Sequence, residues 1–274
     1  MPELPEAETL VQHVRPRLIG ARITRIVHLR RDILRHGPRR VPRWLSGARV
    51  ADVIRRGKRP IIQFEDGQGL IVLLGMTGYL GVHPASDVPR PHTHLRLALD
   101  DGTWELRFAD ARRFGGLSFY ESWNGVVPPG LADLGIEPLD MTLHAFRRAI
   151  ARDRQIKALL MDQSAIAGLG NIYCDEALHR AGIHPLAIAS RIDGPRVARL
   201  CRAIRAVLRE SIRHEGTTII NFAHPDGPGN FADRLRVYDR TGEPCRKCRT
   251  PIARELIAGR STHFCPLCQA VGGV

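Results

Sequence analysis

The sequence predicts an α+β protein of several domains. An N-terminal antiparallel β-sandwich with flanking helices precedes a helical domain with a helix-turn-helix-like hairpin and then a four-cysteine zinc ribbon. Three observations predict this fold: short β-like runs between turn signals over 22–120, a long amphipathic helical pattern over 197–212, and two Cys-x-x-Cys pairs. We expect the domains to cover residues 1–130, 131–234 and 235–274.

The first segment begins with a helical pattern. Apolar residues recur at helical spacing from Leu10 to Leu18, Gly20 is a natural stop, and Pro16 should kink the helix. Strand-like alternation follows, most clearly over 95–99 and 104–108, which an Asp-Asp-Gly turn separates. Paired prolines and glycines over 124–130 mark the end of the β-rich part.

The second segment contains a helix, a glycine-rich turn and a second helix over residues 155–185. We expect Asn171 to be the N-cap of the second helix and Gly182 to end it. Backbone amides in the turn, the Asn171 side chain and Lys157 could together hold a phosphate of DNA. The alternative, an ordinary packed hairpin with a solvated lysine, is favoured by this segment taken alone.

The charge balance indicates a polyanionic partner. The chain has 41 Lys and Arg against 28 Asp and Glu, a net charge of +13, and a pI near 10.4. Nucleic acid is the first candidate, because phosphates attract cations and release counterions on binding. A codon-biased genome would explain the preference for Arg over Lys but not the surplus of cations. With no long apolar run and no signal-peptide pattern, we expect a cytoplasmic protein.

Four cysteines near the C-terminal end predict a zinc site. The pairs Cys245/Cys248 and Cys265/Cys268 are separated by 16 residues, which suits two thiolate knuckles around one Zn²⁺. Disulfides are the alternative, and the absence of an export signal disfavours them. Four ligands leave no open coordination position, so the metal is expected to be structural. Cys174 and Cys201 lie in apolar helical stretches and are expected in the core.

Several motifs together resemble formamidopyrimidine-DNA glycosylase over residues 2–269. They read, in order, MPELPEAET, RRGKRP, LGMTG, DARRFGG, QSAIAGLGNIYCDEALHRAGIHP and the zinc tail beginning GEPCRKC. The resemblance implies a helix-two-turn-helix domain and a bifunctional DNA glycosylase and abasic-site lyase of base excision repair, acting on oxidised purines such as 8-oxoguanine and formamidopyrimidine. The relative to exclude is endonuclease VIII, which favours oxidised pyrimidines; the ELPE start is similar to the purine branch.

The residues at the start of the chain make chemical sense of this resemblance. Once Met1 is removed, Pro2 presents a secondary amine, and an α-amine with a pKa near about 8 is neutral at pH 7 far more often than a lysine. Attack on sugar C1′ gives a cationic iminium that acidifies the C2′ hydrogen, so β- and δ-elimination can cut the strand. The resemblance implies that Glu3 moves protons at the sugar and that Glu6 orients the site or relays a proton. It also implies that Lys58 binds phosphates beside the lesion, where its amine could assist the second elimination, with a solvated turn lysine as the alternative. The alternative for the two glutamates is a helix start whose acids favour the macrodipole.

The resemblance also implies a set of DNA contacts. Met76, Arg112 and Phe114 would fill the gap left by a flipped-out nucleotide, with burial in the core as the alternative for Met76 and Phe114. Asn171 and Arg260 would hold phosphates. The remaining residues assigned to DNA binding are His94, Arg113, Lys157, Tyr238 and Arg254.

The sequence departs from the family pattern at a few positions. Leu73 stands where a phosphate-binding His is expected, Ile219 to Phe222 replace a Leu-Arg-Asp-Phe pattern, and Asn230 stands where an aromatic is common. Two of these changes fall in the loop, roughly 217–233, that the family folds over the flipped base, so the lesion preference is left open. A non-catalytic protein that binds distorted DNA is the rival from another class. We expect a monomer, because no dimerisation heptads are seen, and a location on the bacterial nucleoid.

Overall fold

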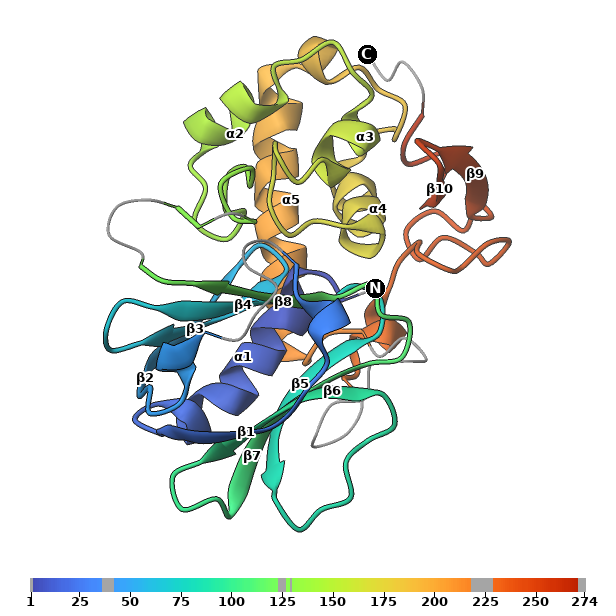
Figure 1. The fold of residues 1–274 in the computed structure, drawn as a ribbon. Coiled ribbons are helices and arrows are strands. Elements are labelled where there is room, and N and C mark those ends of the chain that lie inside the picture. The colour runs from blue at the N-terminus through green and yellow to red at the C-terminus, as the bar shows by residue number, and fades with distance from the viewer. Residues whose placement is uncertain (1, 36–41, 123–126, 129, 218–228, 271–274) are drawn as a thin grey trace. The chain divides into compact units, whose positions relative to one another are not determined.

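The computed structural model describes residues 2–35, 42–122, 127–128, 130–217 and 229–270. The chain divides into two compact units, one of residues 1–132 with 215–229 and the other of residues 133–214 with 230–274 (Figure 1). The helices of the second half and the cysteine ribbon therefore belong to the same unit. Each unit is described by itself. No helix among the described residues combines the length and the apolar character needed to cross a bilayer.

The first unit contains two antiparallel four-stranded sheets, as the sequence predicts. One has the strand order β1 (Ile23–Leu29), β6 (Thr93–Leu99), β7 (Trp104–Asp110), β5 (Gly78–Pro84). The other has the order β2 (Val50–Arg56), β3 (Arg59–Phe64), β4 (Gly69–Leu73), β8 (Gly116–Tyr120). Short 3₁₀ turns lie at Arg31–Ile33 (η1) and Arg43–Leu45 (η2). The expected hairpin is confirmed as β6–β7, in which Leu95 lies opposite Phe108 and Leu97 opposite Leu106.

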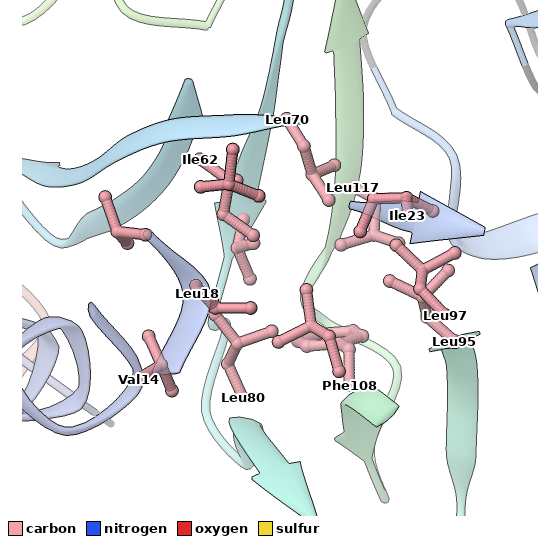
Figure 2. Close-up of a cluster of buried hydrophobic side chains, with 14 of the residues drawn as sticks. Val14, Leu18, Ile23, Ile62, Leu70, Leu80, Leu95, Leu97, Phe108 and Leu117 are labelled. Atoms are coloured by element: carbon pink, nitrogen blue, oxygen red, sulfur yellow. The ribbon is translucent and has the colours of Figure 1, made fainter. Parts of the chain in front are cut away.

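Helix α1 (Leu4–Leu18) packs beside strands of both sheets, against β2 and β3 of one and β5 of the other (Figure 1). It continues through Pro16 for two more residues. Its apolar stripe is buried, and Val14 and Leu18 meet Leu80 and Phe108 in one core cluster (Figure 2). Burial of this stripe holds the first residues of the chain, including Glu3 and Glu6, against the sandwich.

The second unit is helical with a small ribbon. Its helices are α2 (Leu143–Ile150), α3 (Ile156–Met161), α4 (Asn171–Ala181) and α5 (Gly194–Arg213), with 3₁₀ turns η3 (Ala189–Arg191) and η4 (Phe231–Arg234). Strands β9 (Ala253–Ile257) and β10 (Arg260–Phe264) form the ribbon hairpin. Helix α4 packs against α3, α5 and β10. The predicted apolar face of α5 and both core cysteines, Cys174 and Cys201, are buried.

Helix α4 begins one residue away from the predicted position and ends where predicted. Gly182 ends the helix in the left-handed conformation with φ of 65°, as expected. At the other end Gly170 is the N-cap and Asn171 is the first helical residue. The Asn171 side chain is therefore not used to cap its own helix, and its amide nitrogen instead donates to the Ser261 carbonyl of β10 at 2.7 Å.

Candidate active site and nucleic-acid interface

Glu3 and Glu6 form a buried carboxylate pair at the start of α1. Each side chain is only 2% exposed, and Pro2 is buried beside them. The Glu3 backbone amide donates to Glu6 Oε2 at 2.8 Å. This bond is one half of a capping box, and it orients the backbone directly after Pro2. A buried carboxylate is costly unless it is hydrogen-bonded, so the position of Glu6 must be supported from elsewhere as well.

Thr217 supplies that support from the other end of the sequence. Its backbone amide and its hydroxyl both donate to Glu6 Oε1, at 2.9 and 3.0 Å. Gly216 has φ of +80°, and a Cβ there would lie 2.8 Å from the same oxygen, so the chain approaches Glu6 as closely as a glycine allows. Sequence reasoning missed this contact. Thr217 is the last described residue before the loop that was expected to cover a flipped base, and residues 218–228 of that loop lie outside the described residues.

Lys58 lies in the turn between β2 and β3 and is half-buried. The preceding Gly57 has φ of +58° and its carbonyl accepts from Arg55 Nη1 at 3.0 Å. Arg55 Nε also donates to Glu8 Oε2 of α1 at 2.7 Å. The turn that carries Lys58 is therefore tied to the helix that carries the two buried glutamates.

Met76 and Phe114 are exposed, which excludes burial in the core as their role. Met76 in the β4–β5 turn is 37% exposed, and Phe114 in the β7–β8 loop is 59% exposed. The Arg112 guanidinium carbon lies 4.6 Å from the centre of the Phe114 ring. The two loops touch, since a Cβ on Gly75 would lie 2.4 Å from the Gly115 backbone nitrogen. The three side chains thus come from two adjoining loops, and two of them are exposed apolar groups.

Asp110 holds the two loops together. This residue is only 1% exposed. Its carboxylate accepts a hydrogen bond from the Thr77 hydroxyl of the first loop and another, at 2.7 Å, from the Gly115 amide of the second loop. The Arg112 amide donates to the same carboxylate at 3.3 Å. Sequence reasoning did not single out Asp110. The signal available was an acid at the end of a buried strand, followed after Ala111 by two arginines.

Arg113 belongs to the second of these loops, and its side chain lies on the surface. It has φ of +55°, and its Nη1 donates to Asp32 Oδ2 at 3.1 Å. Hydrogen bonds from Arg30 hold the pKa of Asp32 down at about 2. The Asp32 carboxylate is therefore charged at neutral pH and pairs with the Arg113 guanidinium when no DNA phosphate is bound.

His94 does not have the position expected of a DNA contact. It is 3% exposed, and its Nε2 donates to the Asp110 carbonyl at 2.9 Å, so the ring helps to brace the end of β7. The exposed imidazole of this segment belongs to His92, which has φ of +62° and whose carbonyl accepts from the Asp110 amide at 3.1 Å. His94 lies within β6, whereas His92 precedes the strand in the left-handed conformation, and the sequence alone does not indicate where the strand begins.

Lys157 is also placed differently from its prediction. Its side chain is fully buried and forms an ion pair with Asp175, which is fully buried too. The second carboxylate oxygen of Asp175 accepts from the His263 amide of β10 at 2.9 Å. A buried ammonium requires such a partner. Lys157 therefore joins α3 to α4 and, through Asp175, to the ribbon, and it offers no surface for a phosphate.

Four of the remaining predicted contacts lie around the ribbon hairpin. Arg254 donates twice to the Ser261 hydroxyl, at 3.2 and 2.7 Å, and Asn171 donates to the Ser261 carbonyl. Arg260 is exposed at the hairpin turn. Tyr238 is half-buried, and its backbone amide donates to Glu176 Oε1 at 3.1 Å. Ser261, which sequence reasoning missed, connects Asn171 with Arg254.

The four predicted cysteines gather at one point, with all four sulfur atoms within 4.8 Å of one another. The Sγ atoms of Cys248 and Cys265 are 3.3 Å apart, those of Cys248 and Cys268 are 3.4 Å apart, and those of Cys245 and Cys268 are 4.0 Å apart. Around a tetrahedral zinc with bonds of about 2.3 Å, sulfur atoms are separated by about 3.8 Å. The geometry fits zinc. His179 Nε2 lies 3.6 Å from Cys245 Sγ and can donate to that thiolate.

Comparison with known proteins places this arrangement in a family. Three family models match: the formamidopyrimidine-DNA glycosylase N-terminal domain over residues 1–117, its H2TH domain over 134–223, and a zinc finger found in FPG and IleRS over 242–271. The formamidopyrimidine-DNA glycosylase of Herpetosiphon aurantiacus is 42% identical over 280 residues, which cover 98% of this chain and 100% of that one. This chain belongs to the formamidopyrimidine-DNA glycosylase family.

Solved structures agree with that membership. The MutM (FPG) protein from Thermus thermophilus aligns with a TM-score of 0.86 and 39% identity, over 99% of this chain and 100% of that one. A Lactococcus lactis Fpg in complex with abasic-site DNA aligns with a TM-score of 0.90 and 32% identity, over 98% and 100%. The chain is a DNA glycosylase of base excision repair, and abasic-site lyase activity is characteristic of its family. The rival interpretation as a non-catalytic binding protein is set aside.

Membership in the glycosylase family also identifies the metal that the four cysteines hold. The family's zinc finger and the four-cysteine cluster indicate one structural zinc ion, held by Cys245, Cys248, Cys265 and Cys268. The four thiolates fill the coordination shell and the ion supplies structure to the ribbon. The ribbon hairpin, with Arg254 and Arg260, is therefore fixed by the metal at one end and by Asn171 at the other.

Proposed function

We propose that this glycosylase removes oxidised purines, among them formamidopyrimidine and 8-oxoguanine, from double-stranded DNA and then cleaves the strand. Family membership supports this, as do the solved complexes of a Lactococcus lactis relative with DNA that contains Fapy-dG and of a MutM with DNA that contains carbocyclic 8-oxo-G. The observation that carries the mechanism is the buried carboxylate pair directly after Pro2, with Glu6 fixed between the Glu3 amide and Thr217.

The reaction begins at Pro2 after removal of Met1. The secondary amine attacks C1′ of the damaged nucleotide, the bond from C1′ to the base breaks, and the base leaves with a proton. Opening of the sugar ring gives a positively charged iminium. Loss of a C2′ proton then expels the 3′-phosphate, and a second elimination expels the 5′-phosphate. Glu3 carries protons at the sugar, while Glu6 holds the backbone that presents the amine.

The exposed side chains above the two adjoining loops would replace the flipped nucleotide. Met76 and Phe114 offer apolar surface and Arg112 offers a planar cation, and such groups substitute for lost base stacking. Phosphates would be held by Lys58, Arg113, Asn171, Tyr238, Arg254 and Arg260. His92 takes the place of His94 in this proposal because its imidazole is exposed, and Lys157 is left out because it is buried.

The setting of this activity is also a proposal. We place the enzyme in the bacterial cytoplasm, on the nucleoid, acting as a monomer. The domain limits 1–130, 131–234 and 235–274 remain our assignment of the catalytic, helix-two-turn-helix and ribbon parts.

Borohydride trapping tests the role of Pro2. The native protein should form a covalent adduct with a duplex that contains 8-oxoguanine, and Pro2→Gly or a short N-terminal extension should abolish both trapping and nicking. Pro5→Ala is the matched control, since Pro5 lies in the same helix start but carries no terminal amine, and it should still be trapped. Intact trapping and nicking by the Pro2→Gly or extended protein would refute the mechanism.

A substrate panel tests the lesion preference separately. Duplexes with 8-oxoguanine, formamidopyrimidine, thymine glycol or an abasic site are compared with an undamaged duplex in a strand-cleavage gel. Oxidised purines should be cleaved much faster than thymine glycol. Faster cleavage of thymine glycol would make the enzyme similar to endonuclease VIII in specificity, and the proposed substrate class would be wrong while the Pro2 chemistry could stand.

A further inference from the structure

The second unit contains a strongly basic pocket that has no part in the proposed repair reaction. The pocket has a volume of about 850 Å³ and lies between the C-terminal end of α4, the α5 helix, the η4 segment and the first cysteine knuckle. Six cationic side chains line it, against one acidic side chain, that of Glu210. The cations are Arg180, Arg199, Arg234, Arg236, Arg246 and Lys247.

Little of this positive charge is neutralised within the lining. Glu210 accepts from Arg180 Nη1 at 2.7 Å and also interacts electrostatically with Arg234 and Arg236, so one carboxylate faces six cations of the lining. Arg199 and Arg246 donate to the backbone carbonyls of Ala181 and Asp233, at 2.7 and 2.9 Å. Carbonyls orient these guanidinium groups without cancelling their charge. Repulsion among clustered cations costs folding free energy, and a bound anion would remove that cost.

Arg180 carries further donors that the described part of the chain does not satisfy. Its Nε and Nη2 atoms are buried and have no hydrogen-bond partner there, although Nη1 is bound to Glu210. Buried donors of this kind are normally paired, and an unpaired one is a reason to look for a ligand. Arginine nitrogens form a fork that matches the oxygens of a phosphate.

The lining also restricts what the anion can be. The His179 imidazole in the lining belongs to a residue only 6% exposed, and the apolar lining consists of Ala181, Gly182 and Cys268. The pocket therefore offers no open ring face for a base and no large apolar hollow for a peptide anchor. We propose that this pocket binds a polyanion through closely spaced phosphates alone. Two sources carry that chemistry: a free inorganic polyphosphate, or the sugar-phosphate backbone of a second, undamaged DNA segment.

The pocket lies at the opposite end of α4 from the proposed phosphate contact at Asn171. Asn171 lies at the N-terminal end of α4, where it contacts the ribbon hairpin. The pocket lies at the other end, where Gly182 approaches the Cys268 carbonyl. Helix α4 has 11 residues, and a helix rises about 1.5 Å per residue, so roughly 15 Å separates the two ends. A phosphate in the pocket and a phosphate at Asn171 can therefore be bound at once within this unit.

The experiment uses the full zinc-loaded chain and compares Arg199→Gln/Arg234→Gln with Arg148→Gln/Arg191→Gln. All four arginines are exposed, and the last two lie on the same unit outside the pocket lining. Binding of inorganic tripolyphosphate is measured by calorimetry. The native chain and the control should bind it one to one, and the pocket variant should bind at least tenfold more weakly. Equal zinc content and equal melting temperature establish that the variants are folded.

A second measurement separates this site from the lesion site. A labelled duplex with an abasic-site analogue should bind the pocket variant within twofold of the native chain, and tripolyphosphate should not displace it. An unlabelled, undamaged duplex is then added to the preformed complex of protein and lesion duplex. If the native chain binds this second duplex and the pocket variant does not, DNA is the ligand of the pocket. If the native chain binds tripolyphosphate but not the second duplex, free polyphosphate is the ligand. The proposal is overturned by equal binding to both variants, by displacement of the lesion duplex, or by failure of both probes to bind.

Discussion

Replacement of Lys157 with methionine removes the ammonium from a fully buried ion pair and leaves the Asp175 carboxylate without it. Loss of one partner of a buried pair costs about 3–5 kcal/mol, because the remaining charge is neither solvated nor compensated. For a unit of this size, 1 kcal/mol lowers the melting temperature by a few degrees, so we expect a fall of roughly 10–20 °C.

Arg154→Met is the matched control for this substitution. Arg154 also pairs with an aspartate of the same unit, Asp162, at 3.1 Å, but its side chain is 49% exposed. An exposed pair contributes less than about 1 kcal/mol, so this variant should melt within a few degrees of the native chain. The double variant Lys157→Met/Asp175→Asn should recover part of the loss, since it removes the uncompensated charge.

Thermal melting followed by circular dichroism measures the effect, because four of the five described α-helices belong to the second unit. Affinity for a lesion duplex is measured in parallel, at a temperature where every variant is folded. If Lys157→Met melted like Arg154→Met but bound DNA more weakly, Lys157 would be a phosphate ligand as the sequence suggested, and the argument from burial would be wrong.

Four further changes have defined outcomes. Phe114→Ala should leave the melting temperature unchanged, because the ring is 59% exposed. The same change should weaken binding to a lesion duplex by about 1–3 kcal/mol in an anisotropy titration. A large loss of stability would mean that the ring is packed. Gly216→Ala should slow base excision at least tenfold in a single-turnover assay, since its Cβ would meet Glu6, and native rates would show that Glu6 tolerates displacement. Removal of zinc by a chelator should weaken DNA binding while near-ultraviolet signals of the β-rich unit persist, and unchanged affinity after verified metal loss would contradict this. Burial alone would raise the pKa of Glu105, but hydrogen bonds from its two arginine partners lower the pKa overall. The stability that this carboxylate contributes is therefore present above its unfolded pKa of about 4.5 and lost as the pH falls through the lower folded value. Glu105→Gln should flatten the acid limb of the pH–stability curve, and an unchanged acid limb would refute the assignment.

Local patterns predicted most of the fold. The alternation over 95–99 and 104–108 predicted β6 and β7, and the helical spacing from Leu10 to Leu18 predicted the buried face of α1. The cysteine spacing predicted the cluster because two short knuckles need no information from the rest of the chain. In each case the residues that decide the structure are close together in the sequence.

Contacts between distant residues could not be predicted in this way. Glu6 and Thr217 are separated by 211 positions, and nothing in either local sequence indicates the other. The burial of Lys157 depends on Asp175 in the following helix, and a lysine on a helical turn has the same local pattern whether it is solvated or paired. His94 is buried within β6, whereas His92 lies just before the strand, and where β6 begins depends on its pairing with β7.

The carboxylate of Asp110 determines how rigidly the two loops are held before the protein meets DNA. Because it bonds to both loops at once, the side chains that they carry are preassembled before any duplex arrives. If these side chains enter the base stack as proposed, their entry costs little additional ordering of protein, and the energy of the contact is left for distorting the nucleic acid. A weakly stacked or damaged step would then yield to the rigid loops sooner than an intact one, so that discrimination would begin before any bond is broken.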